Sequence, residues 1–266
     1  MRPYIGVTGF MTPQEVRAAQ RKFDMLYMDG SHALQIGVLS SSKKLGGLDN
    51  KYPNRYPNID AISGIFQDHP DAFNVLHYNT DDPETLAYQL KVYAKEIAGP
   101  LLHGFQLNVK WPKADTLLDF RCATSDAYEL MLQISRGAME EFGHQVTPIA
   151  EKIASYGENI DAVLIDQSGG QGHVIKDLQF TLELIDAVKK RAPAVHIGIA
   201  GGLRAGTLHC IRPILARHPE VSIDAESGLR ALEYDDLDLP EVIDYFKAFR
   251  RERAQSVRLR PALRAG

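Results

Sequence analysis

The chain of 266 residues lacks several features that would assign it to a class at once. It has only two cysteines, Cys122 and Cys210, which cannot form a disulfide framework and do not have the paired spacing of a structural zinc site. No stretch approaches the roughly 18 consecutive apolar residues that a membrane span needs, and the N-terminal segment lacks the apolar centre of a secretory signal. We therefore expect a cytoplasmic protein with reduced thiols and no membrane segment.

Two further absences limit the ligands that we expect. The formal net charge is −4, which argues against a general nucleic-acid-binding role. The nine histidines form no His-x-x-x-His pair on an expected helix, and no residues at the expected strand ends have the spacing of a metal site. We expect no required metal and no cofactor.

The sequence does contain a regular alternation of apolar runs and amphipathic segments, which is typical of a parallel α/β fold. With 44% hydrophobic and 24% charged residues, the chain is near the globular average and long enough for one large core. The expected strands are 4–7, 35–39, 73–77, 104–109, 130–134, 162–165 and parts of 195–203 and 221–230. The expected helices begin at 12–15 and cover 58–66, 83–97, part of 114–129, most of 135–155, 177–191 and 239–250. Eight such units predict a single (β/α)8 TIM barrel over residues 1–250.

A long segment at 40–57 interrupts this series after the second strand, at the end of a barrel where active sites form. One reading is a mobile lid that brings Lys43, Lys44, Lys51 or Arg55 to an anionic substrate. The other is a solvated loop with ordinary basic residues. The sequence leaves both open.

The C-terminal end is basic. From Arg250 onward the chain has six arginines and one glutamate, so this end carries a charge of +5 and the remainder carries −9. We expect 251–266 to be a basic, flexible tail, or an end that binds acidic partners.

Two strand ends run directly into small residues. Gly201 and Gly202 follow one apolar run, and Ser227 and Gly228 follow the next. Glycines after a buried strand let backbone N–H groups approach an anion without a Cβ in the way, and the next helix N-terminus adds its positive dipole end. The seventh and eighth units of a barrel often supply such a phosphate site. The ligand we expect is a phosphorylated small molecule.

The sixth expected strand ends in Asp166. A carboxyl group at that end of a barrel strand can point into the pocket and act as a general acid or base, although it can also cap a helix or brace a loop. Gly169, Gly170 and Gly172 follow, and they form either a third phosphate-binding loop or a tight connection.

These motifs resemble those of the phosphoribosylanthranilate isomerase family of tryptophan biosynthesis. The three that carry the likeness are Leu-Ile-Asp at 164–166 with Gly-Gly-Gln-Gly at 169–172, Ala-Gly-Gly-Leu at 200–203, and Asp-Ala-Glu-Ser-Gly-Leu-Arg at 224–230, in which Arg replaces the family's last Glu. The resemblance implies a barrel of the ribulose-phosphate-binding type and a phosphosugar isomerase in which Asp166 is the general acid.

The departures from the family fall on the chemistry. Thr8 stands where the family has the cysteine that acts as base on the sugar C2 proton. A thiol has a pKa of about 8.5, whereas an aliphatic alcohol stays protonated, so Thr8 can bind a substrate but cannot take the proton unaided. The arginine that the family has after its second strand is not evident here, although Lys43 or Lys44 could supply a positive charge.

Other polar side chains follow expected strand ends. Asn108, Lys110 and Asp224 are candidate substrate ligands, whereas His77 is either a possible base or a hydrogen-bonded wall residue. Lys110 could instead form a Schiff base in a lyase or aldolase. Three functions therefore remain open: an isomerase with Asp166 as acid and an altered base, a lyase or aldolase on the same barrel, and a non-catalytic phosphometabolite-binding protein. A homodimer is consistent with each of them.

Overall fold

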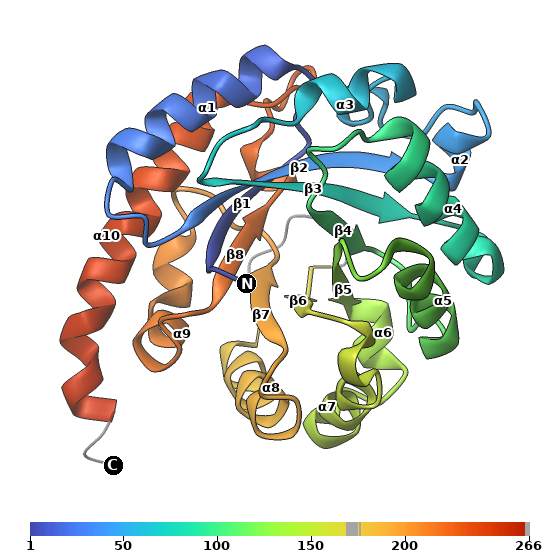
Figure 1. Ribbon diagram of the computed structural model, residues 1–266. Coiled ribbons are helices and arrows are strands. Elements are labelled where there is room, and N and C mark those ends of the chain that lie inside the picture. Colours follow the sequence, from blue (N-terminus) through green and yellow to red (C-terminus); the bar gives the residue numbers. More distant parts are fainter. Residues whose placement is uncertain (169–174, 176, 264–266) are drawn as a thin grey trace.

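The computed structural model describes residues 1–168, 175 and 177–263 of the chain. Eight parallel strands pair in sequence order and close into a barrel, because β1 also pairs with β8 (Figure 1). The strands are β1 (Tyr4–Thr8), β2 (Ala33–Ser41), β3 (Ala72–Asn79), β4 (Gly104–Leu107), β5 (Glu129–Ser135), β6 (Ala162–Asp166), β7 (His196–Ala200) and β8 (Ser222–Ala225). The chain is a (β/α)8 barrel, as the alternating pattern predicts.

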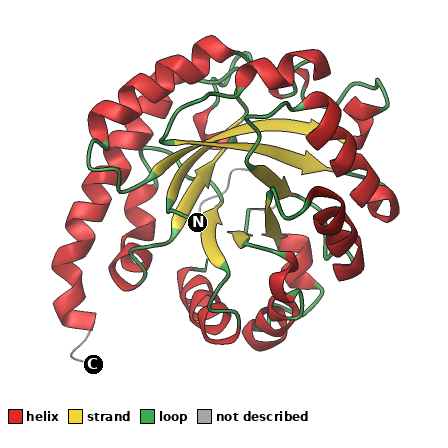
Figure 2. Ribbon diagram, viewed as in Figure 1, coloured by secondary structure: helices red, strands yellow, loops and turns green. Residues whose placement is uncertain are grey.

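The helices surround the barrel (Figure 2). They are α1 (Pro13–Leu26), α2 (Ser42–Leu45), α3 (Ile62–Ile65), α4 (Leu86–Val92), α5 (Ala114–Thr124), α6 (Arg136–Glu140), α7 (Val146–Ala154), α8 (Leu178–Arg191), α9 (Arg212–Arg217) and α10 (Leu239–Leu263). The predicted start of α1 is confirmed as a capping box, in which Glu15 N donates to Thr12 Oγ1 at 3.3 Å and Thr12 N donates to Glu15 Oε2 at 2.9 Å. None of the helices in the described ranges combines the length and the hydropathy that crossing a membrane requires.

The inside of the barrel changes from apolar to polar along its axis. Its amino-terminal layer is a small apolar cluster of Tyr4, Ala33, Val75, Met131 and Ala162. Beyond this layer the barrel interior is polar. Gln35 lies in the first half of β2, and the other buried polar side chains lie toward the carboxyl ends of their strands: Thr8, His77, Gln106, Gln133, Asp166 and Asp224. Since successive residues of a strand point to opposite sides, these polar groups meet at the barrel centre while their neighbours pack under the helices.

Two glycines make room for this polar layer. A Cβ added at Gly37 would lie 2.4 Å from Thr8 Oγ1, and one added at Gly6 would lie 2.5 Å from Asp224 Oδ1. Real Cβ atoms do not approach other heavy atoms so closely, so both positions require glycine for Thr8 and Asp224 to sit side by side.

Two expectations differ from the structure. The last helix, expected over 239–250, continues through residues 251–263 as α10, and its last turns extend past the helical ring (Figure 1). The buried Glu252 explains the continuation, since it accepts hydrogen bonds from Arg212 of α9 and anchors this part of α10 to the barrel. The segment 40–57 is not wholly irregular: β2 extends to Ser41, α2 follows, and residues Pro53–Arg55 form a 3-10 turn.

Candidate active site

A small cavity of about 70 Å³ lies at the carboxyl ends of β3 to β8. It brings together residues that the sequence singles out from distant motifs, namely His77, Asn108, Asp166, Gly201, Gly202, Asp224, Ser227 and Gly228. Gln106 and Gln133 also line it, and the sequence analysis did not single out either of them as a site residue. Gly169, Gly170 and Gly172 lie outside the described residues.

The glycine turns after β7 and β8 form one wall of the cavity. Gly201 and Gly202 have φ of +111° and +60°, which is the left-handed region that favours glycine. A Cβ added at Gly228 would lie 2.3 Å from Leu203 O, so the two turns are in direct backbone contact. A Cβ added at Gly201 would lie 3.3 Å from Asp166 Oδ1. The turns and the predicted general acid therefore adjoin each other.

Asp166 is almost fully buried at 4% exposure, and described residues hold both of its oxygens. Ser168 donates to Oδ1 from its backbone N at 2.9 Å and from its hydroxyl at 2.6 Å. Gln133 Nε2 donates to Oδ2 at 2.9 Å. The Oε1 atom of Gln133 is buried and has no hydrogen-bond partner among the described residues. These contacts fix the direction of the carboxyl group at the edge of the cavity.

Asp224, from β8, is the second buried carboxyl group of the cavity. Thr8 Oγ1 lies 3.0 Å from its Oδ1 and 3.2 Å from its Oδ2, and Gln106 Nε2 donates to Oδ2 at 3.2 Å. Burial raises the pKa of Asp224 above its ordinary value, although the nearby His77 and the two hydrogen bonds act in the opposite direction. Thr8 itself is completely buried, and it is not among the residues that line the cavity. Thr8 therefore contacts Asp224, and its hydroxyl lies beneath the cavity wall.

Gln106, from β4, connects Asp224 to side chains of β2 and β3. Its Oε1 accepts a hydrogen bond from Gln35 Nε2 at 3.0 Å, which fixes the orientation of the amide. Its Nε2 then faces both Asp224 and His77 Nδ1, the latter at 2.9 Å. Because the Gln106 amide is the donor, His77 Nδ1 is the acceptor and a neutral His77 carries its proton on Nε2.

Arg55 ties the segment after β2 to the rim of the cavity. Its guanidinium pairs with Glu226 at 2.8 Å and with Asp235 at 2.7 Å, and it donates to Ser227 Oγ at 3.3 Å. Asp235 follows β8 in the chain, so Arg55 spans from the segment after β2 to the segment after β8. The three lysines of this segment have other partners: Lys43 pairs with Asp81, Lys44 pairs with Asp49, and Lys51 lies over the Tyr52 ring.

Arg230 is a buried side chain that holds three segments together. Its Nη2 donates to Gly9 O at 2.9 Å, and its Nη1 donates to Asn54 O at 3.3 Å and Asp235 O at 3.1 Å. It thereby links the turn after β1, the segment after β2 and the loop after β8.

Two predicted substrate ligands lie elsewhere. Lys110 is exposed and pairs with Glu141 at 2.7 Å, because β4 ends at Leu107 and Lys110 falls in the turn beyond it. Lys43 pairs with Asp81 at 3.1 Å on the surface. Neither lysine lines the cavity. Both lysines were predicted as ligands from their nearness to a strand end, and the sequence alone does not show where the strand stops.

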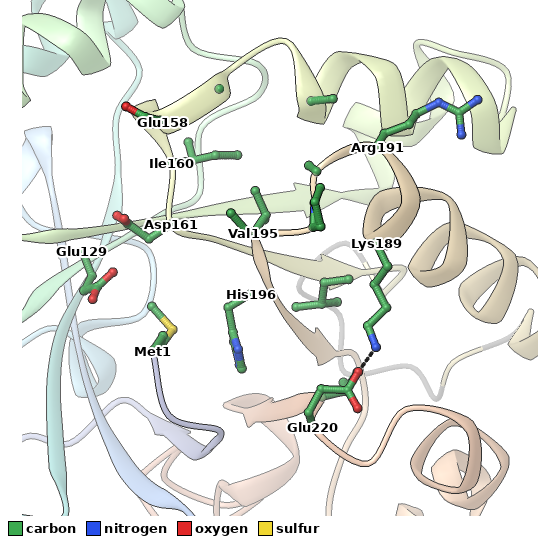
Figure 3. Close-up of a pocket in the computed structure, with 17 residues that line it drawn as sticks. Met1, Glu129, Glu158, Ile160, Asp161, Lys189, Arg191, Val195, His196 and Glu220 are labelled. Carbon is green, nitrogen blue, oxygen red and sulfur yellow. Dashed lines mark hydrogen bonds and ion pairs between the residues drawn. The ribbon is translucent and has the colours of Figure 1, made fainter.

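A larger cavity of about 710 Å³ opens at the other end of the barrel, where β5, β6 and β7 begin (Figure 3). Two of its acidic groups have basic partners: Glu220 pairs with Lys189, which also lines the cavity, and Asp161 accepts a hydrogen bond from Arg121 at 2.5 Å. Catalytic groups of TIM barrels lie at the carboxyl ends of the strands, whereas this end generally serves stability. The smaller cavity is therefore the candidate active site.

One group of side chains, Asp24, His69 and Asp71, is close enough together to share a metal ion. These side chains already have protein partners. Asp71 pairs with Arg2 at 2.8 Å, Gln20 donates to Asp24 at 2.7 Å, and the Asp71 backbone N donates to His69 Nδ1 at 3.1 Å. A histidine that binds a metal through Nε2 normally donates from Nδ1, so this arrangement fits a structural brace better than a metal site.

Comparisons with known proteins bear on the fold. No protein-family model and no curated protein matches the chain. Among solved structures, phosphoribosylanthranilate isomerase from Thermotoga maritima superposes with a TM-score of 0.55 at 13% identity, covering 93% of this chain and 98% of that one. Orotidine 5'-monophosphate decarboxylase from Methanocaldococcus jannaschii gives 0.53 at 13% identity, covering 94% and 99%. A chitinase domain from Pyrococcus furiosus gives 0.52 at 12% identity, covering 96% of each chain. At these identities the likeness shows the barrel fold alone.

Proposed function

We propose that the chain is an isomerase of a phosphorylated small molecule, with Asp166 as the general acid. The observation that carries the proposal is the contact between Asp166 and the Gly201 turn at one cavity. A phosphate bound at that turn would hold a substrate with its reactive part near the acid. The sequence resemblance to phosphoribosylanthranilate isomerase supports the same reaction class.

The phosphate group would bind at the turns after β7 and β8. Consecutive residues of left-handed or turn conformation direct their backbone N–H groups to one point, which favours an anion. Gly201, Gly202 and Gly228 provide such backbone without side chains, and Ser227 adds a hydroxyl.

The proposed acid would protonate the substrate oxygen or nitrogen at which charge develops. Burial excludes water from a carboxyl group and strengthens its interaction with a bound substrate. Asp166 meets that condition at 4% exposure, and Ser168 and Gln133 hold its orientation. The reaction also needs a base that removes a proton from carbon. The Thr8 hydroxyl stays protonated near neutral pH, so it cannot be that base.

The two alternatives differ in their support. A Schiff-base mechanism needs a desolvated lysine, and the exposed, ion-paired Lys110 does not meet that requirement. The second alternative is a protein that binds phosphate without turnover. The absence of a thiol at position 8 favours it. Turnover discriminates it from the isomerase.

The test pairs a binding measurement with a turnover measurement. Gly228→Ala places a Cβ 2.3 Å from Leu203 O and should displace the turn, whereas Gly206→Ala, a few residues along from the β7 turn, meets no atom within 4 Å. We expect inorganic phosphate to bind to the wild type and to Gly206→Ala, measured by calorimetry, and to bind at least tenfold more weakly to Gly228→Ala.

Turnover of phosphoribosyl amines, followed by mass spectrometry, should then fall by roughly 100-fold or more in Asp166→Asn, the scale expected for loss of a general acid. An Asn variant with full activity would remove Asp166 from the mechanism. Equal phosphate affinity in the two glycine variants would remove the turns from the binding site.

A further inference from the structure

We propose that Asp224 is the catalytic base of this site and that Thr8 and Gln106 are the residues that position it. The inference rests on the proposed function, since it assigns the second proton transfer of that reaction. It arises from the geometry of a side chain that the sequence analysis took only as a substrate ligand.

Asp224 lies where the proposed reaction needs a proton acceptor. It lines the same cavity as Asp166, on a different strand, and the turn at Ser227 and Gly228 follows it directly. A substrate held by its phosphate at that turn would have one carboxyl group from β6 and another from β8 beside it. Two carboxyl groups in separate environments can divide acid and base roles between them.

The hydrogen bonds at Asp224 leave a carboxylate oriented and ready to accept a proton. Thr8 Oγ1 is 3.0 Å from one oxygen, and Gln106 Nε2 is 3.2 Å from the other. Gln35 holds the Gln106 amide from behind, so Gln106 cannot turn its oxygen toward Asp224 without losing that bond. Thr8 thus contributes to the reaction through Asp224. This role needs only a hydrogen-bond donor, which a hydroxyl group supplies.

The burial of Asp224 also increases its strength as a base. An ordinary aspartate is a weak proton acceptor near neutral pH, and burial disfavours the charged form. The raised pKa of Asp224 is consistent with that requirement. The other polar and titratable groups that act on it are Thr8 on β1, His77 on β3, Gln106 on β4 and Glu226 beyond β8, and the buried Tyr4 and Tyr245 respond to its charge.

The proposed step is balanced in protons and electrons. Asp166 gives its proton to the oxygen or nitrogen of a carbonyl or imine group, and the π-electron pair moves onto that atom. An Asp224 oxygen takes the proton from the neighbouring carbon, and the C–H electron pair forms the new carbon–carbon double bond. Asp166 is then ionised and Asp224 protonated, and exchange of one proton with solvent at each group restores the enzyme. No oxidant or reductant takes part.

The experiment measures proton abstraction directly with ribose 5-phosphate as the probe. In deuterated water, a base that removes the C2 proton returns deuterium to that carbon, and NMR follows the exchange. We expect exchange with the wild type and at least a 100-fold slower rate in Asp224→Asn. The matched control is Asp119→Asn on the exposed side of α5, which should retain the wild-type rate.

Calorimetry with inorganic phosphate and thermal unfolding of Asp224→Asn establish that the variant folds and keeps its phosphate site. Thr8→Val then tests positioning, since loss of the hydroxyl removes a hydrogen bond that lowers the pKa of Asp224. In a plot of the exchange rate against pH, the acid limb should move to higher pH in Thr8→Val and should not move in Thr8→Ser. A purely structural role of Thr8 predicts lower rates without that movement.

The outcomes separate the two proposals. If Asp224→Asn binds phosphate and exchanges within threefold of the wild type, the inference is overturned and the proposed function stands. A wild type that binds phosphate but exchanges no proton also overturns the assignment of Asp224. A wild type that binds no phosphate overturns the proposed function itself.

Discussion

Gly37→Ala tests whether the polar centre of the barrel depends on a missing side chain. The added Cβ would lie 2.4 Å from Thr8 Oγ1 and 2.8 Å from Thr8 Cα. An ordinary contact of this kind is near 3.5 Å or longer, so Thr8 would have to move by about 1 Å. A change of the Thr8 rotamer could relieve the first contact but not the second, because Cα belongs to the backbone of β1.

We place the cost of Gly37→Ala near the upper end of the range for overpacking, at about 3 kcal/mol. That is a large fraction of the roughly 5–15 kcal/mol by which a domain is stable. Urea unfolding followed by circular dichroism measures it. The displacement should also lengthen the bond from Thr8 to Asp224 and slow the deuterium exchange described above.

Gly64→Ala is the matched control, since Gly64 lies within α3 and an added Cβ meets no atom within 4 Å. Alanine is the better helix former, so this variant should be more stable by about 0.5–1 kcal/mol. If Gly37→Ala unfolded at the same urea concentration as the wild type, it would refute the claim that β1 packs closely against β2 around Thr8.

Three further predictions concern the supports around the barrel. Glu252→Gln should destabilise the chain by about 1–2 kcal/mol, because it replaces the buried carboxylate partner of Arg212 with a neutral amide, and amide exchange should rise in 251–263. Unchanged exchange there would show that α10 is held otherwise. Arg55→Lys should expose 42–58 to limited proteolysis, since lysine cannot bind Glu226 and Asp235 together; an unchanged cleavage pattern would contradict the clamp. Burial lowers the pKa of His196 to about 4 and that of His32 to about 3, so the unfolded chain binds more protons below pH 6.5. The contribution of these two histidines to stability should be complete above pH 6.5 and should be lost as the pH drops from 6.5 to about 3. His32→Gln should flatten that slope in urea midpoints measured across the range.

The eight-unit fold could be predicted because each apolar run is long enough to be a buried strand and a helical segment follows all but one of them. The position of Asp166 could also be predicted, since four apolar residues in 162–165 place it at the strand end. The glycine turns followed from the same reasoning. In all these cases the deciding contacts are local in sequence.

The pairing of Thr8 with Asp224 could not be predicted, because it depends on the register in which β1 closes against β8, more than 200 residues away in the chain. Gln133 carried a signal that we did not use: it is a polar residue within an otherwise apolar strand. The length of α10 was not predicted, because the arginines beyond 250 were taken as the sign of a charged tail. The burial of Glu252 depends on its ion pair with Arg212, which is distant in the sequence.

The central claim is that the cavity at the carboxyl ends of the strands binds the phosphate of a substrate. A crystal structure of the protein soaked in phosphate, beside one of Gly228→Ala treated in the same way, tests it most directly. We predict an anion against the backbone of 201–202 and 227–228, close to Asp166, in the wild type and not in the variant. An anion bound only at the larger cavity where β5 to β7 begin, or bound equally in both proteins, would contradict the account.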